Sequence, residues 1–397
     1  MSGKYFRPRI LGLLIGLVGM ALVAACGGDE ATPTTQATAT SAAQATATSP
    51  APTSPAPAAK EVIRFHDGQW GSLWVHNAVA RYIVENGYGY PTEEIQGTTG
   101  TMLVTLIEGD IDVNMEIWRM NLPAWYNEHT ASGVLVDLAG YTDPEESLPA
   151  GAKGQVIAFS GQGFYVPRYV IEGDPDRGIE PLAPDLKSVL DLPDYWELFK
   201  DPNDPSKGAV FNCIIGWECQ KINRAKWYAY GLYDTYNVVE PGGGAALKAA
   251  VVGPYEAGEP FLSYYWEPTD VVNTRDLVLL EEPERTEACI AALDAAMAAG
   301  EPYESEIGCA FASGDVHTGV HKSLVERAPE VTEFLANLYM GASVLAELEQ
   351  WKGENDVEWR DVGVKFLKEN RDMWTSWITD ANAQEIIARV DAELALE

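Results

Sequence analysis

The sequence has few basic residues for its length. Its 397 residues include 27 Lys and Arg but 59 Asp and Glu, which gives a net charge of −32. All the acidic residues and 24 of the basic ones follow Cys26, so that part of the chain carries a charge of −35. This excess of negative charge argues against partners such as nucleic acid or an anionic lipid surface. It is compatible with cationic solutes, although most of these charges are expected to form a solvated acidic surface.

No hydrophobic run is long enough for a comfortable membrane-spanning helix, because the apolar run over residues 10–25 is too short. Three basic residues precede it: Lys4, Arg7 and Arg9. The run ends in Val23-Ala24-Ala25-Cys26, which resembles the lipobox of bacterial lipoproteins, where the cysteine becomes the acylated N-terminus. We therefore expect residues 1–26 to be a lipoprotein signal peptide and Cys26 to anchor the protein to the extracytoplasmic side of the cell membrane. The alternative is an ordinary signal peptide with a chance cysteine.

The segment that follows lacks the large apolar residues that form a hydrophobic core. Residues 31–59 consist of Ala, Thr, Ser, Pro and Gln, with no charged or aromatic residue. Such a composition does not offset the entropy lost when a backbone is ordered. Residues 27–60 are therefore predicted to be a disordered tether that spans on the order of 30 Å as a flexible coil.

Cysteine is also scarce, and four cysteines remain after Cys26. An even number in an exported chain suggests disulfides, and no Cys-x-x-Cys spacing or adjacent histidine supports a metal site instead. Three pairings are possible. Loop closure favours Cys213 with Cys219 and Cys289 with Cys309.

Motifs of catalysis are missing as well. The sequence contains no nucleophile elbow, phosphate-binding loop or metal-binding motif. His317 and His321 are four residues apart, but Gly319 and the β-branched residues around it favour a strand over a helix. A zinc site would also need two further ligands, so these histidines are expected to be structural or exposed. The chain is predicted to be no enzyme and to hold no cofactor or metal.

Aromatic residues, in contrast, stand out at the ends of predicted elements. Residues 260–268 read as a buried strand that ends in Tyr264-Tyr265-Trp266-Glu267-Pro268, and proline stops a strand ladder. Three more tryptophans stand beside glycine or acidic residues near predicted element ends: Trp70, Trp118 and Trp217. Several aromatic faces at one point form a cage for a quaternary ammonium group, which has no N–H to donate.

The rest of the chain alternates between strands and helices. Residues 62–66 and 109–115 are predicted strands, and residues 73–86 and 103–107 carry helical periodicity, the first stopped by Gly87. An amphipathic helical block follows over residues 323–395. This alternation predicts an α/β protein with parallel sheet covered by helices.

Taken in order, these segments resemble the glycine betaine/proline betaine/choline-binding proteins of ABC transporters over about residues 61–392. The residues that carry the resemblance are Gly109-Asp110-Ile111-Asp112-Val113, Glu116-Ile117-Trp118, Tyr165-Val166-Pro167, Cys213-Ile214-Ile215-Gly216-Trp217-Glu218-Cys219, Tyr264-Tyr265-Trp266-Glu267-Pro268, Asp315-Val316-His317 and Trp374-Thr375-Ser376-Trp377. The resemblance implies a type II periplasmic-binding-protein fold, in which two α/β lobes are joined by two crossover segments with the ligand cleft between them. We place the crossovers near residues 163–167 and 314–318. Lobe I would then comprise residues 61–163 plus 318–397, and lobe II residues 164–317.

The resemblance also implies a function and a site. The protein would capture a quaternary-ammonium osmolyte such as glycine betaine and deliver it to an ABC transporter permease. The expected cage residues are Trp70, Trp118, Tyr165, Trp217 and Trp266. The backbone amides of residues 213–218, at a helix start, would bind the ligand carboxylate. His66 or His76 could assist there.

One departure bears on the ligand. Choline-preferring relatives have an aspartate two residues after the first cleft tryptophan, where this chain has Ser72, so a betaine is favoured over choline. Two alternatives stay open: a receptor that reports ligand to a sensor kinase, and a sugar-binding or sugar-hydrolysing protein that uses the acids beside the tryptophans. Trp125 is left unassigned. The remaining tryptophans considered are expected to serve packing: Trp196, Trp227, Trp351, Trp359, Trp374 and Trp377.

Overall fold

The computed structural model describes residues 59–140 and 150–397. The predicted signal peptide, Cys26 and the tether up to residue 58 lie outside the described residues. The described residues form one compact unit. In the described residues, no helix combines the length and the apolar character needed to cross a bilayer.

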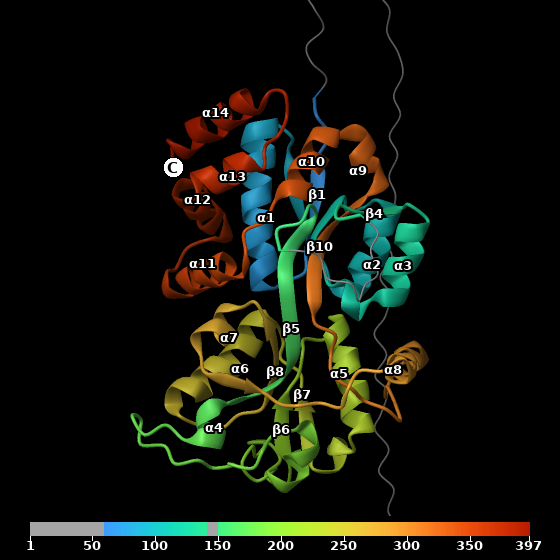
Figure 1. The fold of residues 1–397 in the computed structure, drawn as a ribbon, viewed down its shortest axis with the longest axis vertical. Coiled ribbons are helices and arrows are strands. Elements are labelled where there is room, and N and C mark those ends of the chain that lie inside the picture. The colour runs from blue at the N-terminus through green and yellow to red at the C-terminus, as the bar shows by residue number, and fades with distance from the viewer. Residues whose placement is uncertain (1–58, 141–149) are drawn as a thin grey trace, which may run out of the picture. The chain divides into compact units, whose positions relative to one another are not determined.

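Strands and helices alternate along most of this unit, as predicted (Figure 1). The strands are β1 (Ile63–Asp67), β2 (Thr92–Gln96), β3 (Val113–Ile117), β4 (Leu135–Asp137), β5 (Gln155–Pro167), β6 (Gly208–Phe211), β7 (Tyr236–Val239), β8 (Ser263–Glu267), β9 (Leu277–Leu279) and β10 (Gly314–His321). The α-helices are α1 (Gly71–Ile83), α2 (Thr99–Glu108), α3 (Pro123–Ala131), α4 (Arg168–Glu172), α5 (Glu218–Ala229), α6 (Gly244–Ala257), α7 (Asp270–Thr274), α8 (Glu287–Ala299), α9 (Lys322–Arg327), α10 (Pro329–Asn337), α11 (Ala342–Glu354), α12 (Trp359–Glu369), α13 (Arg371–Ser376) and α14 (Ala383–Leu394).

The sheet order is β2-β1-β3-β10-β5-β8-β6-β7, with β4 on β10 and β9 on β5. β1 pairs in parallel with β2 and β3, and β6 pairs in parallel with β7 and β8. Between these two parallel groups run β5 and β10, which pair antiparallel with each other and with the neighbouring strands β8 and β3 (Figure 1). β5 and β10 include residues 163–167 and 314–318, where the crossovers are predicted from the sequence, and the division into two lobes stays a prediction.

The ends of α1 and α2 differ from the boundaries predicted from the sequence. α2 begins after Thr98, whose side chain accepts a hydrogen bond from the Thr101 amide, and ends at Gly109 in the left-handed conformation, with φ of 80°. The strand predicted from residue 109 therefore starts only at Val113. The first helix was expected to end at Gly87.

The structure places that end two residues later. α1 runs into a single π-helical turn, and the left-handed residue behind it is Gly89, with φ of 73°. Gly87 has a different role, since a Cβ atom there would lie 2.9 Å from a methyl carbon of Ile386. Its small size allows α14 to pack closely on this turn.

A buried polar network lies along β10, where both crossovers meet. His317 contacts Asp137 through Nδ1 at 2.8 Å and Asp315 through Nε2 at 3.0 Å. Asp315 also accepts hydrogen bonds from Arg119 and from Gln155. Burial opposes a charge on the imidazole, but the bonds to the two aspartates outweigh it and raise the pKa of His317 above its ordinary value. His317 is therefore structural and lies on a strand, as predicted.

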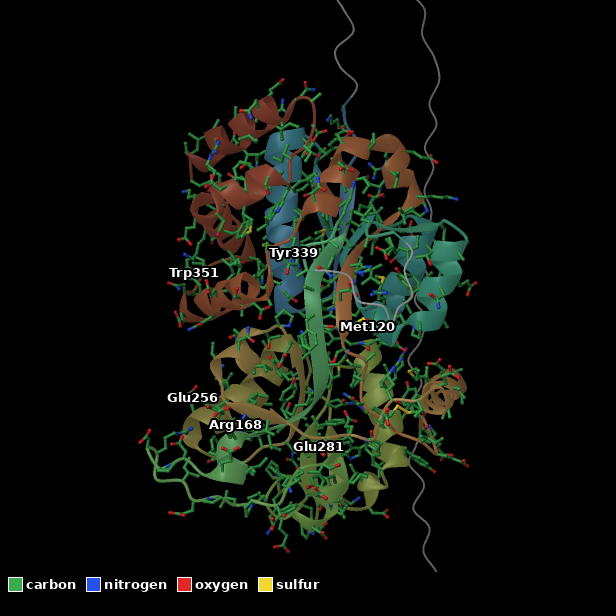
Figure 2. All side chains as sticks on the ribbon, viewed as in Figure 1. Met120, Arg168, Glu256, Glu281, Tyr339 and Trp351 are labelled. Atoms are coloured by element: carbon green, nitrogen blue, oxygen red, sulfur yellow. A yellow bond between two sulfur atoms is a disulfide. The ribbon has the colours of Figure 1, made fainter. Side chains whose placement is uncertain are left out.

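The tryptophans assigned to packing lie in the core or against it. Trp227 and Trp374 are almost completely buried, and the Trp374 indole donates to the carbonyl of Leu367 at 2.9 Å. Trp196, Trp351 and Trp359 are partly buried and pack on the main core, with Trp351 on the outer side of α11 (Figure 2). Packing also explains Trp377, which stacks on Phe366, and Trp125, which donates to the carbonyl of Leu103.

The described part of the chain holds two disulfides, with the pairing that loop closure favours. Cys213, in the loop between β6 and α5, is joined to Cys219 in the first turn of α5. Cys289 on α8 is joined to Cys309, in the segment that leads to β10. Cys289 and Cys309 belong to a small core cluster that also contains Ala225 of α5.

Candidate functional site

A small cavity of about 60 Å³ lies at the carboxyl ends of β3 and β8 and at the start of α5. Its lining comes from both parallel strand groups and from β5. The lining residues are Trp70, Thr99, Met102, Glu116, Trp118, Asn121, Leu122, Gln162, Trp217, Glu218, Cys219, Tyr264 and Trp266. Its position agrees with the rule that ligands bind at the carboxyl ends of strands in α/β sheets.

Four of the five aromatic residues predicted from the sequence meet at this cavity. Trp70 directly precedes α1, Trp118 directly follows β3, Trp217 directly precedes α5, and Trp266 lies on β8. The Trp217 ring lies 5.5 Å from Trp70 and 5.5 Å from Trp266, in both cases nearly perpendicular. Edge-to-face packing of this kind is the arrangement that aromatic pairs prefer.

Tyr165 does not line the cavity. In the register of β5 against β8, Gln162 lies opposite Trp266, and alternate residues of a strand face the same side. Tyr165, three residues beyond Gln162, therefore lies on the other face of the sheet. There burial and the neighbouring Glu267 raise the pKa of its phenol. The structure puts Tyr264 rather than Tyr165 at the cavity, and a role for Tyr165 in ligand binding stays a prediction.

Glu116 on β3 connects the surrounding side chains. Its Oε2 accepts hydrogen bonds from the indoles of Trp70, at 2.6 Å, and Trp118, at 3.2 Å. The Ser72 hydroxyl donates to the same oxygen at 3.1 Å, and Nδ1 of His76 lies 2.8 Å from Oε1. The sequence pattern contained a signal for this role. Residues two apart on a strand share a face, so Glu116 belongs beside the tryptophan that follows it by two.

The loop before α5 brings Trp217 against the other strand group. The indole of Trp217 donates to the carbonyl of Gly68 at 2.9 Å. Gly216 has φ of 96°, and a Cβ atom there would come within 2.5 Å of the Thr98 side chain. Glycine is thus required both by the backbone conformation and by the close approach.

A further contact joins helices α7 and α11 close to the start of α1. The amide of Asp270, at the start of α7, donates to Oε2 of Glu349 on α11, at 3.4 Å. The same carboxyl lies against Gly71, at the start of α1. Burial and the nearby Asp270 raise the pKa of Glu349 well above its usual range, which favours a neutral carboxyl at this contact.

Several polar side chains at the cavity are already engaged in hydrogen bonds or ion pairs. Gln162 exchanges hydrogen bonds with Asn121, at 3.1 and 3.3 Å, and accepts one from the Tyr264 hydroxyl at 2.9 Å. Glu218 pairs with Lys221 at 2.9 Å. Sequence reasoning did not single out Gln162 or Asn121 as site residues, because nothing in their local pattern sets them apart.

The two histidines considered from the sequence differ in position. His76 contacts Glu116, as described above, whereas His66 is not part of the lining. Burial lowers the pKa of His66 to about 4, so this imidazole is neutral near neutral pH. In residues 59–140 and 150–397, no cluster of His, Cys, Asp or Glu side chains is suited to hold a metal ion.

The charge of the lining is one-sided. It includes the acidic residues Glu116 and Glu218, and none of the described residues that line it is Lys, Arg or His. Aromatic faces together with negative charge favour a cation that presents apolar surface. The same lining offers no cationic side chain to an anion.

Comparison with known proteins places this geometry in context. A family described as the substrate-binding domain of ABC-type glycine betaine transport systems matches residues 61–369. The glycine betaine/proline betaine-binding periplasmic protein of Escherichia coli (strain K12) is 24% identical over 202 residues. That match covers 49% of this chain and only 58% of the relative's length.

Solved structures are similar in fold. The glycine betaine/L-proline-binding protein ProX from Borrelia burgdorferi has a TM-score of 0.59 and 18% identity, covering 82% of this chain and 99% of its own. An ABC-transporter choline-binding protein in complex with choline has a TM-score of 0.59 and 18% identity, covering 84% and 98%. Lactococcal OpuAC, closed and complexed with glycine betaine, has a TM-score of 0.56 and 13% identity, covering 81% and 100%. The fold class predicted from the sequence is confirmed.

Proposed function

Because the chain belongs to the family of substrate-binding domains of ABC-type glycine betaine transport systems, we propose that it captures a small quaternary-ammonium compound outside the cytoplasm and delivers it to an ABC permease. The observation that carries the proposal is one cavity lined by four indoles and a phenol, with no basic side chain among its described lining residues. Proteins that the chain resembles are named for glycine betaine, proline betaine or choline.

The physical basis is the attraction between a cation and aromatic faces. A trimethylammonium group spreads its charge over methyl groups and presents no N–H, so its removal from water costs less than that of a primary ammonium. Each aromatic face contributes roughly 0.5–2 kcal/mol when water is excluded. Trp70, Trp217 and Trp266 are each less than a tenth exposed, so water has little access to these rings.

A betaine also carries a carboxylate, for which we propose the start of α5. Trp217 precedes this helix without a side-chain cap, and Glu218 and Cys219 of its first turn line the cavity. Amides at a helix start donate to anions, and the helix dipole favours negative charge there. The disulfide Cys213–Cys219 would hold this loop in place.

The proposed protein binds its ligand and does not convert it chemically. Hydrolysis of a sugar would need one carboxyl to donate a proton and a second to assist. Glu116 instead accepts from three donors and contacts His76, while Glu218 is paired with Lys221. Sugars also require many hydrogen-bonding partners, whereas this lining is mostly aromatic and apolar.

Calorimetric titration of the purified protein with a methylation series tests the proposal. Glycine betaine should bind more tightly than dimethylglycine, because the latter presents a polar N–H to an aromatic wall. No ligand should be consumed. Equal affinities for the two compounds, or no binding of glycine betaine, choline, proline betaine or carnitine, would contradict the proposed function.

Two tryptophan variants separate binding from folding. Replacing Trp266 by Ala should weaken binding by roughly 2–4 kcal/mol, since central aromatic anchors behave as hot spots. Trp374→Ala is the matched control, because it removes the same side chain from the core; it should cost about 3–5 kcal/mol of stability and leave affinity nearly intact. Titrations and denaturant unfolding of both variants decide, and the reverse pattern would refute the site.

We also propose that ligand capture closes two lobes. Lobe I would comprise residues 61–163 plus 318–397, and lobe II residues 164–317, with β5 and β10 as the crossovers. The bond from Trp217 to Gly68 then joins the lobes across the cavity. A cage completed only on closure lets the ligand favour the closed form through its differential affinity.

Small-angle scattering tests this closure. Saturating glycine betaine should lower the radius of gyration and shift tryptophan fluorescence over the same concentration range. A constant radius in a protein that demonstrably binds would show that the lobes do not close on the ligand.

Delivery to a permease would be helped by an anchor, and we propose that Cys26 carries it. The segment Val23-Ala24-Ala25-Cys26 and the uncharged tether behind it support this proposal. The full-length chain, expressed in a bacterial host with radioactive palmitate, should be labelled and fractionate with membranes. Cys26→Ala should lose the label and the membrane association; labelling that persists in this variant would overturn the assignment.

A further inference from the structure

We propose that Glu116 is the positioning and charge-determining residue of the cage: its carboxylate fixes the indoles of Trp70 and Trp118 and acts as the counter-ion of the bound ammonium. This inference rests on the proposed function and adds to it the rule by which the cavity selects ligands. It assigns a role to a side chain that is not itself aromatic.

Glu116 holds the two indoles in position. A single oxygen, Oε2, accepts from Trp70 at 2.6 Å and from Trp118 at 3.2 Å. Trp70, directly before α1, lies 46 residues from Glu116 in the sequence, whereas Trp118 directly follows β3. An indole nitrogen can only donate, so one shared acceptor fixes the orientation of both rings.

Glu116 also brings a negative charge to the cavity. An oxygen that accepts from two indoles and the Ser72 hydroxyl acts only as an acceptor, as a carboxylate does. Glu116 is 1% exposed, yet it lines the cavity. The other acid of the lining, Glu218, is paired with Lys221. Oε2 of Glu116 accepts from two indoles and a hydroxyl, and its Oε1 contacts Nδ1 of His76, which is not among the lining residues. Glu116 therefore supplies the negative charge that faces a ligand here.

Ser72 contacts the same carboxylate. Ser72 is a neutral residue two positions after Trp70, so it adds no charge to the cage. In the structure the serine hydroxyl donates to Glu116, so a carboxylate from β3 stands beside it. The cage thus keeps a counter-ion although Ser72 is neutral, and the serine helps to orient it.

A charge buried beside the ligand should distinguish a cation from a neutral molecule of the same shape. The suitable pair is choline and its carbon isostere, in which a tert-butyl group replaces the trimethylammonium. In the unmodified protein choline should bind roughly 100-fold more tightly than the isostere, because a nearby charge acts strongly where water is excluded.

The decisive experiment measures both affinities by competition titration in three variants of the full chain. Glu116→Gln removes the charge and should lower the ratio to about 10-fold or less. Glu116→Asp keeps the charge but shortens the reach to the indoles, so both ligands should bind more weakly while the ratio is kept. Glu180→Gln is the control, because Glu180 is exposed and outside the lining; it makes the same substitution and should leave the ratio unchanged.

Each outcome bears on the inference. An unchanged ratio in Glu116→Gln removes the counter-ion role, and unchanged affinities in Glu116→Asp remove the positioning role. If Glu116→Gln does not fold, as melting curves would show, the Asp variant and the ratio in the unmodified protein still decide. A ratio near one in the unmodified protein overturns the inference alone, whereas failure to bind any quaternary ammonium compound overturns the proposed function.

Discussion

Indole N–H groups that face a shared cavity must find acceptors, and this requirement organises the centre of the molecule. Trp70 and Trp118 share one carboxylate oxygen of Glu116, and Trp217 uses the carbonyl of Gly68. Buried donors without partners are costly, so these bonds fix which way each ring faces. The apolar faces are thereby left to surround a ligand.

A neighbouring ion pair links the site to β10. Trp118 is followed directly by Arg119, whose guanidinium bonds to Asp315 on β10, and Asp315 contacts His317 on the same strand. Met120, labelled in Figure 2, packs beside the start of β10, where a Cβ atom on Gly314 would lie 3.2 Å from its Cγ. The residue after Trp118 therefore connects this side of the cavity to β10.

Much of this arrangement was accessible from sequence because it depends on local pattern. Tryptophans beside glycine or acidic residues at strand ends predicted four residues of the cavity lining, and the resemblance to a known family ordered them in one fold. The sequence did not predict which tyrosine lines the cavity. Tyr165 and Tyr264 both lie in buried strands, and only the register of β5 against β8 decides which one faces the cavity. Of the partners of Glu116, the sequence pattern indicates only Trp118, two residues away. Trp70, Ser72 and His76 lie 40 or more residues away, so these partners could not be read from the sequence.

The central claim is that the aromatic rings surround a quaternary ammonium group. Proton NMR of the trimethylammonium signal of glycine betaine, with and without protein, tests it most directly, because aromatic ring currents act on protons held against ring faces. We predict an upfield shift of the bound methyl signal that is largely lost in Trp266→Ala. A bound ligand whose methyl signal does not move would contradict the account.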